Sequence, residues 1–179
     1  MSPGLSLCCE NLVSYEEARS KEDKTTIFPT KILLATDGSE EAALAAKTAA
    51  DLANQTDSEL HIAHVRPRIT PHYPGYYLGP EVVEKAEEKE REQLDRQAQL
   101  LLDTQVEQVR AVGGSVAQLH LRLGRAEEEI VALAEELGAG LIVLGSRGRG
   151  GVRRALMGSV SDSVVHHAHC PVLVVRQEE

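Results

Sequence analysis

Residues 141–161 read LIVLGSRGRGGVRRALMGSVS, and this stretch decides the fold class. Its first four residues, Leu141 to Leu144, are all aliphatic, and a run that is apolar on both faces is typical of a buried parallel strand. The residues that follow are rich in glycine, and the last ones lead into a helical pattern at about 159–168. This order predicts a strand, a glycine-rich turn and a helix that packs back onto the sheet.

The same alternation of apolar runs and helical patterns continues on both sides of this stretch. Ile32 to Ala35 is a second run that is apolar on both faces. Ser39 is a suitable cap for the helix that follows, and Glu40 and Glu41 in its first turn suit the positive end of the helix dipole. Residues 117–123 alternate apolar with polar side chains, which favours an edge strand. Strands are predicted at 32–35, 60–65, 117–123, 141–144 and 172–175, and helices at 40–53, 81–112, 126–137 and 159–168. Together they predict an α/β fold, an open sheet of five parallel strands with helices on both faces.

Length, charge and cysteine content limit the class of protein. A chain of 179 residues accommodates one domain, predicted at residues 30–179, and an N-terminal extension at residues 1–29. The net charge of -9 argues against a general nucleic-acid-binding protein, and every apolar run is far shorter than the roughly 20 residues of a membrane span. Three cysteines outside any ligand pattern, and a start without signal-peptide features, predict a protein of the reducing cytoplasm.

Ligand-binding residues are expected where two of these strands end. In open parallel sheets the ligand crevice lies beyond the carboxyl ends of the strands, which directs attention to residues 36–39 and 145–161. Glycines let an anion approach backbone amides, and the first N–H groups of a helix have no partner within it. The second segment therefore predicts a phosphate site, although a glycine-rich stretch alone is equally compatible with a plain connecting loop.

Polar side chains in both segments suit a nucleotide. Ser159 and Ser161 add hydroxyl donors at the start of the last helix. Arg147 is one of four arginines, with those at 149, 153 and 154, that make the connecting loop basic within an acidic protein. Asp37 is a candidate for accepting hydrogen bonds from ribose hydroxyls or for helping to hold a divalent metal.

The spacing of the glycines is specific. The chain contains neither a G-x-x-x-x-G-K-[ST] loop nor a strand-linked G-x-G-x-x-G, which disfavours P-loop NTPases and standard dinucleotide folds. Gly145, Gly148, Gly158 and Ser159 instead match the pattern G-2x-G-9x-G-[ST]. With ILLATDGSE at 32–40, His64-Val65 and HCPVLVVR at 169–176, the chain resembles the universal stress proteins, and within them the subclass that binds ATP.

This resemblance implies a Rossmann-like fold, a nucleotide ligand and a position for each contact. Ala35 and Thr36 would border the base, Asp37 would lie near ribose and adenine, and the backbone of Val65 would contact adenine. Ribose and phosphates would be lined by Leu144, Gly145 and Gly148. The phosphate chain would be bound, through backbone amides and hydroxyls, by Gly158, Ser159, Val160 and Ser161. Arg147 joins them as a basic candidate. The resemblance also implies a homodimer through the last strand, Val172 to Val175, whose apolar edge would need covering.

The function predicted from the residues and the resemblance is that of an ATP-binding module in a stress response, in which nucleotide occupancy biases a dimer or a partner surface. No general base stands beside a nucleophile, so no catalytic residue is assigned. Slow ATP hydrolysis, phosphate transfer to Ser159 or Ser161, cyclic-nucleotide (cAMP) binding and a scaffold without a ligand are the alternatives. The metal is not determined by the sequence; Mg²⁺ is expected to accompany the triphosphate, held partly by water and phosphate oxygens.

Overall fold

The computed structural model describes residues 27–68, 80–149 and 157–177. Five strands form one fully parallel sheet in the order β3-β2-β1-β4-β5. The predicted extension, apart from residues 27–29, and the arginines at 153 and 154 lie outside the described residues. The strands are β1 (Lys31–Ala35), β2 (Glu59–Arg66), β3 (Gln118–Leu123), β4 (Leu141–Gly145) and β5 (Val172–Val175). The predicted fold class is confirmed.

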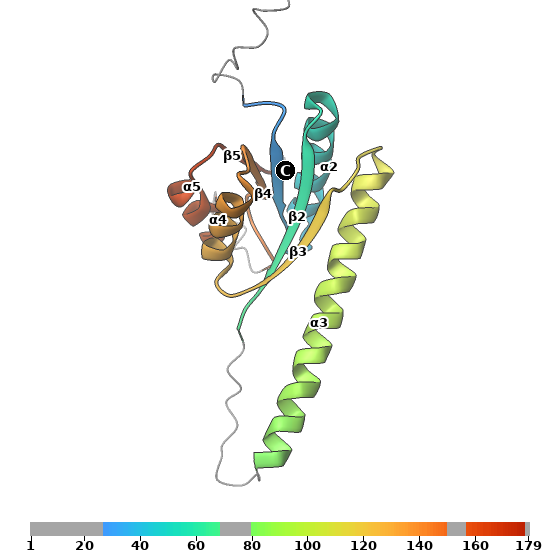
Figure 1. Cartoon of the computed structure of the whole chain (residues 1–179), viewed down its shortest axis with the longest axis vertical. Helices are drawn as coiled ribbons and strands as arrows, with labels where there is room; N and C mark the ends of the chain where they lie inside the picture. The colour runs from blue at the N-terminus through green and yellow to red at the C-terminus, as the bar shows by residue number, and fades with distance from the viewer. Residues whose placement is uncertain (1–26, 69–79, 150–156, 178–179) are drawn as a thin grey trace, which may run out of the picture.

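Helices cover both faces of the sheet (Figure 1). They are α2 (Glu40–Thr56), α3 (Pro80–Ala111), α4 (Ala126–Leu137) and α5 (Ser159–His167). α2 and α3 pack on one face, and α4 and α5 on the other. Adjacent residues of β1 point to opposite faces, so Leu34 is buried against α2 and α3 while Leu33 is buried against α4 and α5.

α2 lies close to the sheet because its buried face is built from alanine. Ala45, Ala46, Ala49 and Ala50 are completely buried. Ser39 caps the helix as predicted, its hydroxyl accepting a hydrogen bond from the backbone N–H of Ala42 at 3.2 Å. The helix runs three residues beyond the predicted end, to Thr56, because the polar residues there lie on its outer side and Asp57, in the left-handed conformation, ends it.

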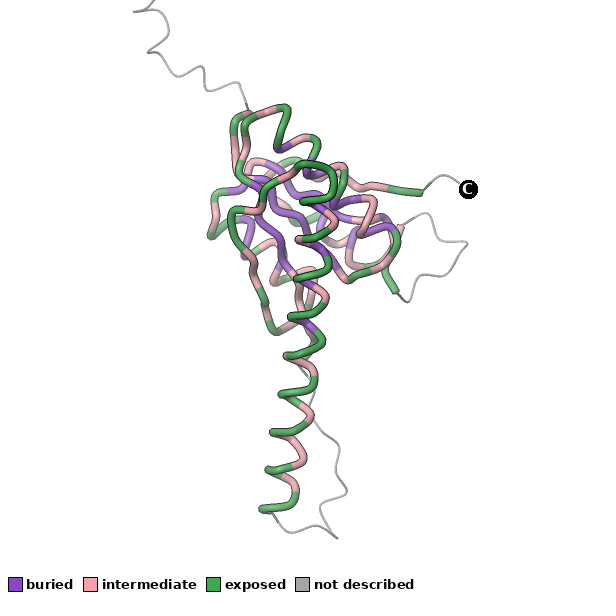
Figure 2. The backbone as a smooth tube through the Cα atoms, turned by 90° about the vertical axis from the view of Figure 1, so that its right-hand side faces the viewer, coloured by how far each residue is buried: buried purple, intermediate pink, exposed green. Residues whose placement is uncertain are grey.

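α3 is much longer than the sheet is wide. Only its second half packs on the body, through buried residues that include Leu102 and Val109, while its first half extends beyond the carboxyl ends of the strands (Figures 1 and 2). Gly113 ends the helix with a positive φ of 79°, a conformation that glycine adopts without strain. Within the described residues, no helix is both long and apolar enough to cross a bilayer.

The strand order places the expected crevice at the centre of the sheet. β3 and β5 are the two edges, which confirms the alternating stretch at 117–123 as an edge strand. β1 lies between β2 and β4, so the connections leaving β1 and β4 diverge to opposite faces. This divergence opens the sheet at the carboxyl ends of β1 and β4, where open α/β sheets hold their ligands.

Candidate functional site

A cavity of about 1160 Å³ opens at the carboxyl ends of β1, β2 and β4. Its walls come from the segments that follow these strands, from the second half of α3 and from the starts of α4 and α5. Every candidate residue of the sequence analysis lines it: Ala35, Thr36, Asp37, Val65, Leu144, Gly145, Arg147, Gly148, Gly158, Ser159, Val160 and Ser161. The fold therefore brings together residues that are up to 126 positions apart.

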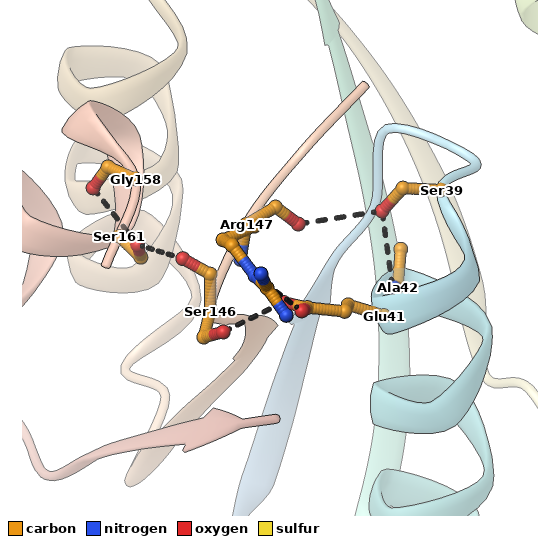
Figure 3. A network of polar contacts seen from close by, with 7 residues as sticks. All are labelled: Ser39, Glu41, Ala42, Ser146, Arg147, Gly158 and Ser161. Atoms are coloured by element: carbon orange, nitrogen blue, oxygen red, sulfur yellow. Dashed lines mark hydrogen bonds and ion pairs between the residues drawn. The ribbon is translucent and has the colours of Figure 1, made fainter. Parts of the chain in front are cut away.

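The loop after β4 is held from α2 by one carboxylate, Glu41 (Figure 3). Oε2 of Glu41 accepts hydrogen bonds from the Ser146 hydroxyl at 2.6 Å and from the Arg147 backbone N–H at 2.5 Å. Oε1 accepts a third from Nε of Arg147 at 2.7 Å, which makes a nearly buried ion pair. Ser146 and Glu41 do not line the cavity; they lie behind its wall.

Glu41 is ionised at neutral pH. Burial would raise the pKa of this carboxyl, but the hydrogen bonds from Ser146 and Arg147 and the charge of Arg147 outweigh burial and lower the pKa below its usual value. In the sequence, Glu41 is recognisable only as a favourable charge at a helix start. No local pattern showed its second partner, which lies 106 residues away.

Asp37 holds the same loop at a second point. Its Oδ1 accepts a hydrogen bond from the Ser39 N–H at 3.0 Å, and its Oδ2 accepts one from the Arg149 N–H at 2.8 Å. Each carboxylate oxygen can accept a further hydrogen bond, so the predicted contact with ribose stays a prediction. Asp37 therefore has a structural task within the protein itself.

The carbonyl of Ser146 joins this loop to the start of α5 (Figure 3). It accepts hydrogen bonds from the Gly158 N–H at 2.7 Å and from the Ser161 hydroxyl at 2.8 Å. The Ser161 hydroxyl is also 2.9 Å from the Gly158 carbonyl. A hydroxyl has only one proton to donate, and the Ser161 hydroxyl donates it to these backbone carbonyls. The Ser161 hydroxyl is therefore already used in contacts within the protein.

The first turn of α5 has backbone donors without acceptors in the helix. Gly158 is the N-cap, and it has no side chain that could accept a hydrogen bond from these N–H groups. The first backbone hydrogen bond of the helix runs from the Asp162 N–H to the Gly158 carbonyl at 2.9 Å. The N–H groups of Ser159, Val160 and Ser161 precede that bond. These N–H groups lie at the positive end of the helix dipole, and the three residues that carry them line the cavity. Helix starts of this kind are typical anion-binding sites.

The three glycines of the signature differ in what surrounds them. A Cβ on Gly145 would come within 3.0 Å of the backbone carbon of Glu41, and a Cβ on Gly148 would overlap the Asp37 carboxylate. A Cβ on Gly158 would meet no atom closer than the Ser146 carbonyl at 3.4 Å, which is ordinary contact. The φ of Gly158, -82°, is also accessible to any residue.

Two residues that line the cavity, His64 on β2 and Gln105 on α3, were not assigned to the site from the sequence. Nδ1 of His64 donates a hydrogen bond to the Thr36 carbonyl at 2.8 Å, which ties β2 to the end of β1. Gln105 is buried in the apolar stripe of α3, donates to Gln108, and its Oε1 has no partner among the described residues. A polar residue at an apolar position of a helical stripe was the available signal. In the described part of the chain, no group of three or more potential ligand side chains could hold a metal ion.

Comparisons with known proteins agree with this geometry. The family model described as the universal stress protein family matches residues 29–176. A universal stress protein of Methanocaldococcus jannaschii is 35% identical over 150 residues, which is 82% of each chain.

Two solved structures show the same fold. The universal stress protein UspA from Lactobacillus plantarum is 27% identical, with a TM-score of 0.62 over 83% of this chain and 99% of that one. A universal stress protein from Archaeoglobus fulgidus, solved in complex with dAMP, is 25% identical, with a TM-score of 0.52 over 84% of this chain and 99% of that one. The sequence, the fold and the family model agree, and the chain belongs to the universal stress protein family.

Proposed function

We propose that this protein binds ATP in the cavity and acts as a nucleotide-dependent regulatory module in a stress response. The observation that carries the proposal is the first turn of α5, where residues 159–161 line the cavity after an N-cap glycine and their backbone N–H groups have no acceptor within the helix. A triphosphate provides the several anionic oxygens that such a turn binds. The structure of the Archaeoglobus fulgidus relative with dAMP supports an adenine nucleotide as the ligand class.

The proposed nucleotide runs across the carboxyl ends of the strands. Its base lies beside Ala35, Thr36 and the Val65 backbone, and its ribose near Asp37 and Leu144. The phosphates follow Gly145, Arg147 and Gly148 toward the turn that Gly158 opens, where Ser159, Val160 and Ser161 offer N–H groups. Ala35 and Val65 offer an apolar surface to the base, whereas the hydrogen-bond donors lie at the other end of the cavity. Mg²⁺ supplies charge compensation for the triphosphate when it is bound.

Binding is favoured over phosphate transfer by the surroundings of the two candidate nucleophiles. The Ser161 hydroxyl is directed at backbone carbonyls, which do not act as bases. Among the described residues, no histidine or carboxylate is hydrogen-bonded to the Ser159 hydroxyl. A nucleophilic serine needs a base within hydrogen-bond reach, and the described part of the cavity offers neither serine one.

A homodimer through β5 completes the proposal. β5 is an edge strand, and all four of its residues, Val172 to Val175, are only half-buried in the single chain. An apolar strand with one unpaired edge is stabilised by pairing with another strand, and a second copy of the chain supplies one. Sedimentation equilibrium of the wild-type protein, with and without ATP, tests this pairing. A monomer under both conditions would contradict it.

The first experiment identifies the ligand. Freshly purified protein is denatured and the supernatant is chromatographed for nucleotides; the stripped protein is then titrated calorimetrically with Mg-ATP, AMP and cAMP. We expect released ATP, or tighter binding of ATP than of AMP or cAMP. Tighter binding of cAMP would replace this proposal with cyclic-nucleotide buffering, and no binding of any of the three would leave a scaffold.

A variant of the N-cap tests the site itself. Gly158→Val adds a branched side chain at the opening of α5 and is expected to abolish ATP binding while the protein stays folded. Ser163→Val is the matched control, because it adds the same side chain to the same helix at a position outside the cavity. Unchanged ATP affinity in folded Gly158→Val would show that the phosphates do not lie at this turn.

A further inference from the structure

Glu41 connects the two parts of the cavity wall that are proposed to bind phosphate (Figure 3). It accepts three hydrogen bonds from Ser146 and Arg147, and the Ser146 carbonyl accepts two more from Gly158 and Ser161. A continuous set of hydrogen bonds therefore runs from α2, through the loop after β4, to the first turn of α5. Glu41 and Ser146 are themselves absent from the cavity lining.

We propose that Glu41 is a positioning residue of the nucleotide site, which acts through Ser146 and Arg147 to fix the first turn of α5 against the loop after β4. The inference rests on the proposed binding of ATP. It follows from how the loop is held: the Ser146 hydroxyl, the Arg147 backbone N–H and Nε of Arg147 all donate to Glu41. Gly145 leaves room for this contact, because a Cβ there would lie 3.0 Å from the backbone carbon of Glu41. A site for several phosphate oxygens depends on the spacing of its donors.

A positioning role and a simple charge effect predict opposite results. Glu41 is a negative charge close to the proposed phosphates, so if charge alone mattered, removing it would strengthen ATP binding. If Glu41 positions the loop, removing its charge weakens ATP binding. The carboxylate accepts three hydrogen bonds, and the NH₂ group of a glutamine would face at least one of these donors with another donor. The sign of the change therefore separates the two.

The test compares Glu41→Gln with Glu40→Gln, its neighbour in the first turn of α2. Glu40 is exposed, and its side chain has no hydrogen-bonding partner among the described residues. Glu40→Gln therefore removes the same charge as Glu41→Gln without breaking a side-chain contact. Calorimetric titrations with Mg-ATP and with adenosine are expected to show about tenfold weaker ATP binding in Glu41→Gln and unchanged adenosine binding. Glu40→Gln is expected to bind both as the wild type does. ATP binding that is unchanged or tighter in Glu41→Gln, or an equal loss for adenosine, would overturn the proposal.

A second measurement does not depend on ATP. Amide hydrogen exchange of the ligand-free protein is expected to rise at residues 158–162 in Glu41→Gln and to stay at the wild-type level in Glu40→Gln. Ser146→Ala, which removes one hydrogen bond to Glu41 and keeps the Ser146 carbonyl, is expected to give a smaller rise at the same residues and serves if Glu41→Gln does not fold. Unchanged exchange in these variants would refute the coupling, whereas raised exchange in a protein that binds no ATP would refute only the proposed function.

Discussion

The loop after β4 and the first turn of α5 line the same cavity, but the protein holds them in different ways. In the loop, the backbone N–H groups of Arg147 and Arg149 already donate to Glu41 and Asp37. In the first turn of α5, the N–H groups of residues 159–161 have no acceptor in the helix and no capping side chain. The N–H groups of Arg147 and Arg149 in the loop are thus already paired within the protein. Those in the first turn of α5 are the ones that a ligand would pair.

The glycines of the two regions show the same difference. Gly145 and Gly148 are required by the protein, because a side chain would collide with α2 in one case and with Asp37 in the other. Gly158 has neither a forbidding neighbour nor an unusual φ. The signature therefore contains two kinds of glycine. Gly145 and Gly148 are needed for the packing of the loop, whereas we expect Gly158 to be needed for the close approach of the ligand.

Arg147→Ala should have the largest effect, because it removes the ion pair between the loop and Glu41. Glu41 would be left as a nearly buried charge without its cationic partner, and we expect the free energy of unfolding to fall by about 3 kcal/mol at pH 7. Chemical denaturation measures this loss, with Arg149→Ala as the control, since Arg149 is exposed and its backbone N–H is kept. Equal stability of the two variants would show that the ion pair does not anchor the loop.

The pH dependence of the wild-type protein reports on the same carboxylate. The pKa of Glu41 is lowered in the fold, so its stabilising contribution is present above the ordinary value of about 4.5 and is lost as the pH falls below it. In Arg147→Ala, protonation relieves an unpaired charge, so the deficit relative to wild type should shrink at acid pH. A deficit that stays constant down to pH 3.5 would contradict this.

Paired alanine substitutions test the two kinds of glycine directly. Gly145→Ala should destabilise the protein by about 1–3 kcal/mol, because the new methyl group meets the backbone of α2. Gly158→Ala should change stability by less than about 1 kcal/mol and weaken ATP binding by about tenfold. Thermal denaturation and calorimetric titration of both variants measure the two quantities. The comparison fails if Gly158→Ala is the less stable variant or binds ATP as the wild type does.

Asp37→Ala tests whether one residue serves both the loop and the ligand. Loss of the hydrogen bonds to Ser39 and Arg149 should lower the free energy of unfolding by about 1–2 kcal/mol, and loss of a ribose contact should weaken ATP binding by about 1–3 kcal/mol. Asp51→Ala, at an exposed position of α2, controls for the loss of charge. An effect on stability without an effect on affinity would restrict Asp37 to the structural task.

Much of this arrangement was predictable because it depends on local patterns. The apolar runs at 32–35 and 141–144, the Ser39 cap and the glycine spacing each act within a few residues, and together they predict a parallel sheet and the place of its crevice. The contacts of Glu41, the role of Gly148 and the burial of Gln105 depend on which segments meet in space. A charge at a helix start looks the same in a sequence whether it faces water or a loop 106 residues away.

The smallest expected effect lies outside the cavity, in a histidine pair at the β3 edge. Nδ1 of His61 and Nε2 of His120 are hydrogen-bonded at 3.1 Å, and their rings stack with centroids 5.4 Å apart. Burial and the nearby charges of His61 and Arg122 lower the pKa of His120, and Glu136 opposes them only in part. The folded protein therefore prefers neutral His120.

This preference makes stability decline slightly as the pH falls below about 6.5, the ordinary histidine pKa, where the unfolded chain takes up the proton first. His120→Gln keeps a hydrogen-bonding group opposite His61 but does not titrate, so the fall in stability between pH 7 and pH 5 should be shallower than in the wild type, with ATP affinity at pH 7 unchanged. Denaturant titrations across this range measure it. An equal slope in both proteins would contradict the role of His120, whereas altered ATP affinity would link the β3 edge to the cavity. The two acid responses of stability therefore occur in different pH ranges, that of the β3 edge below about pH 6.5 and that of Glu41 below about pH 4.5.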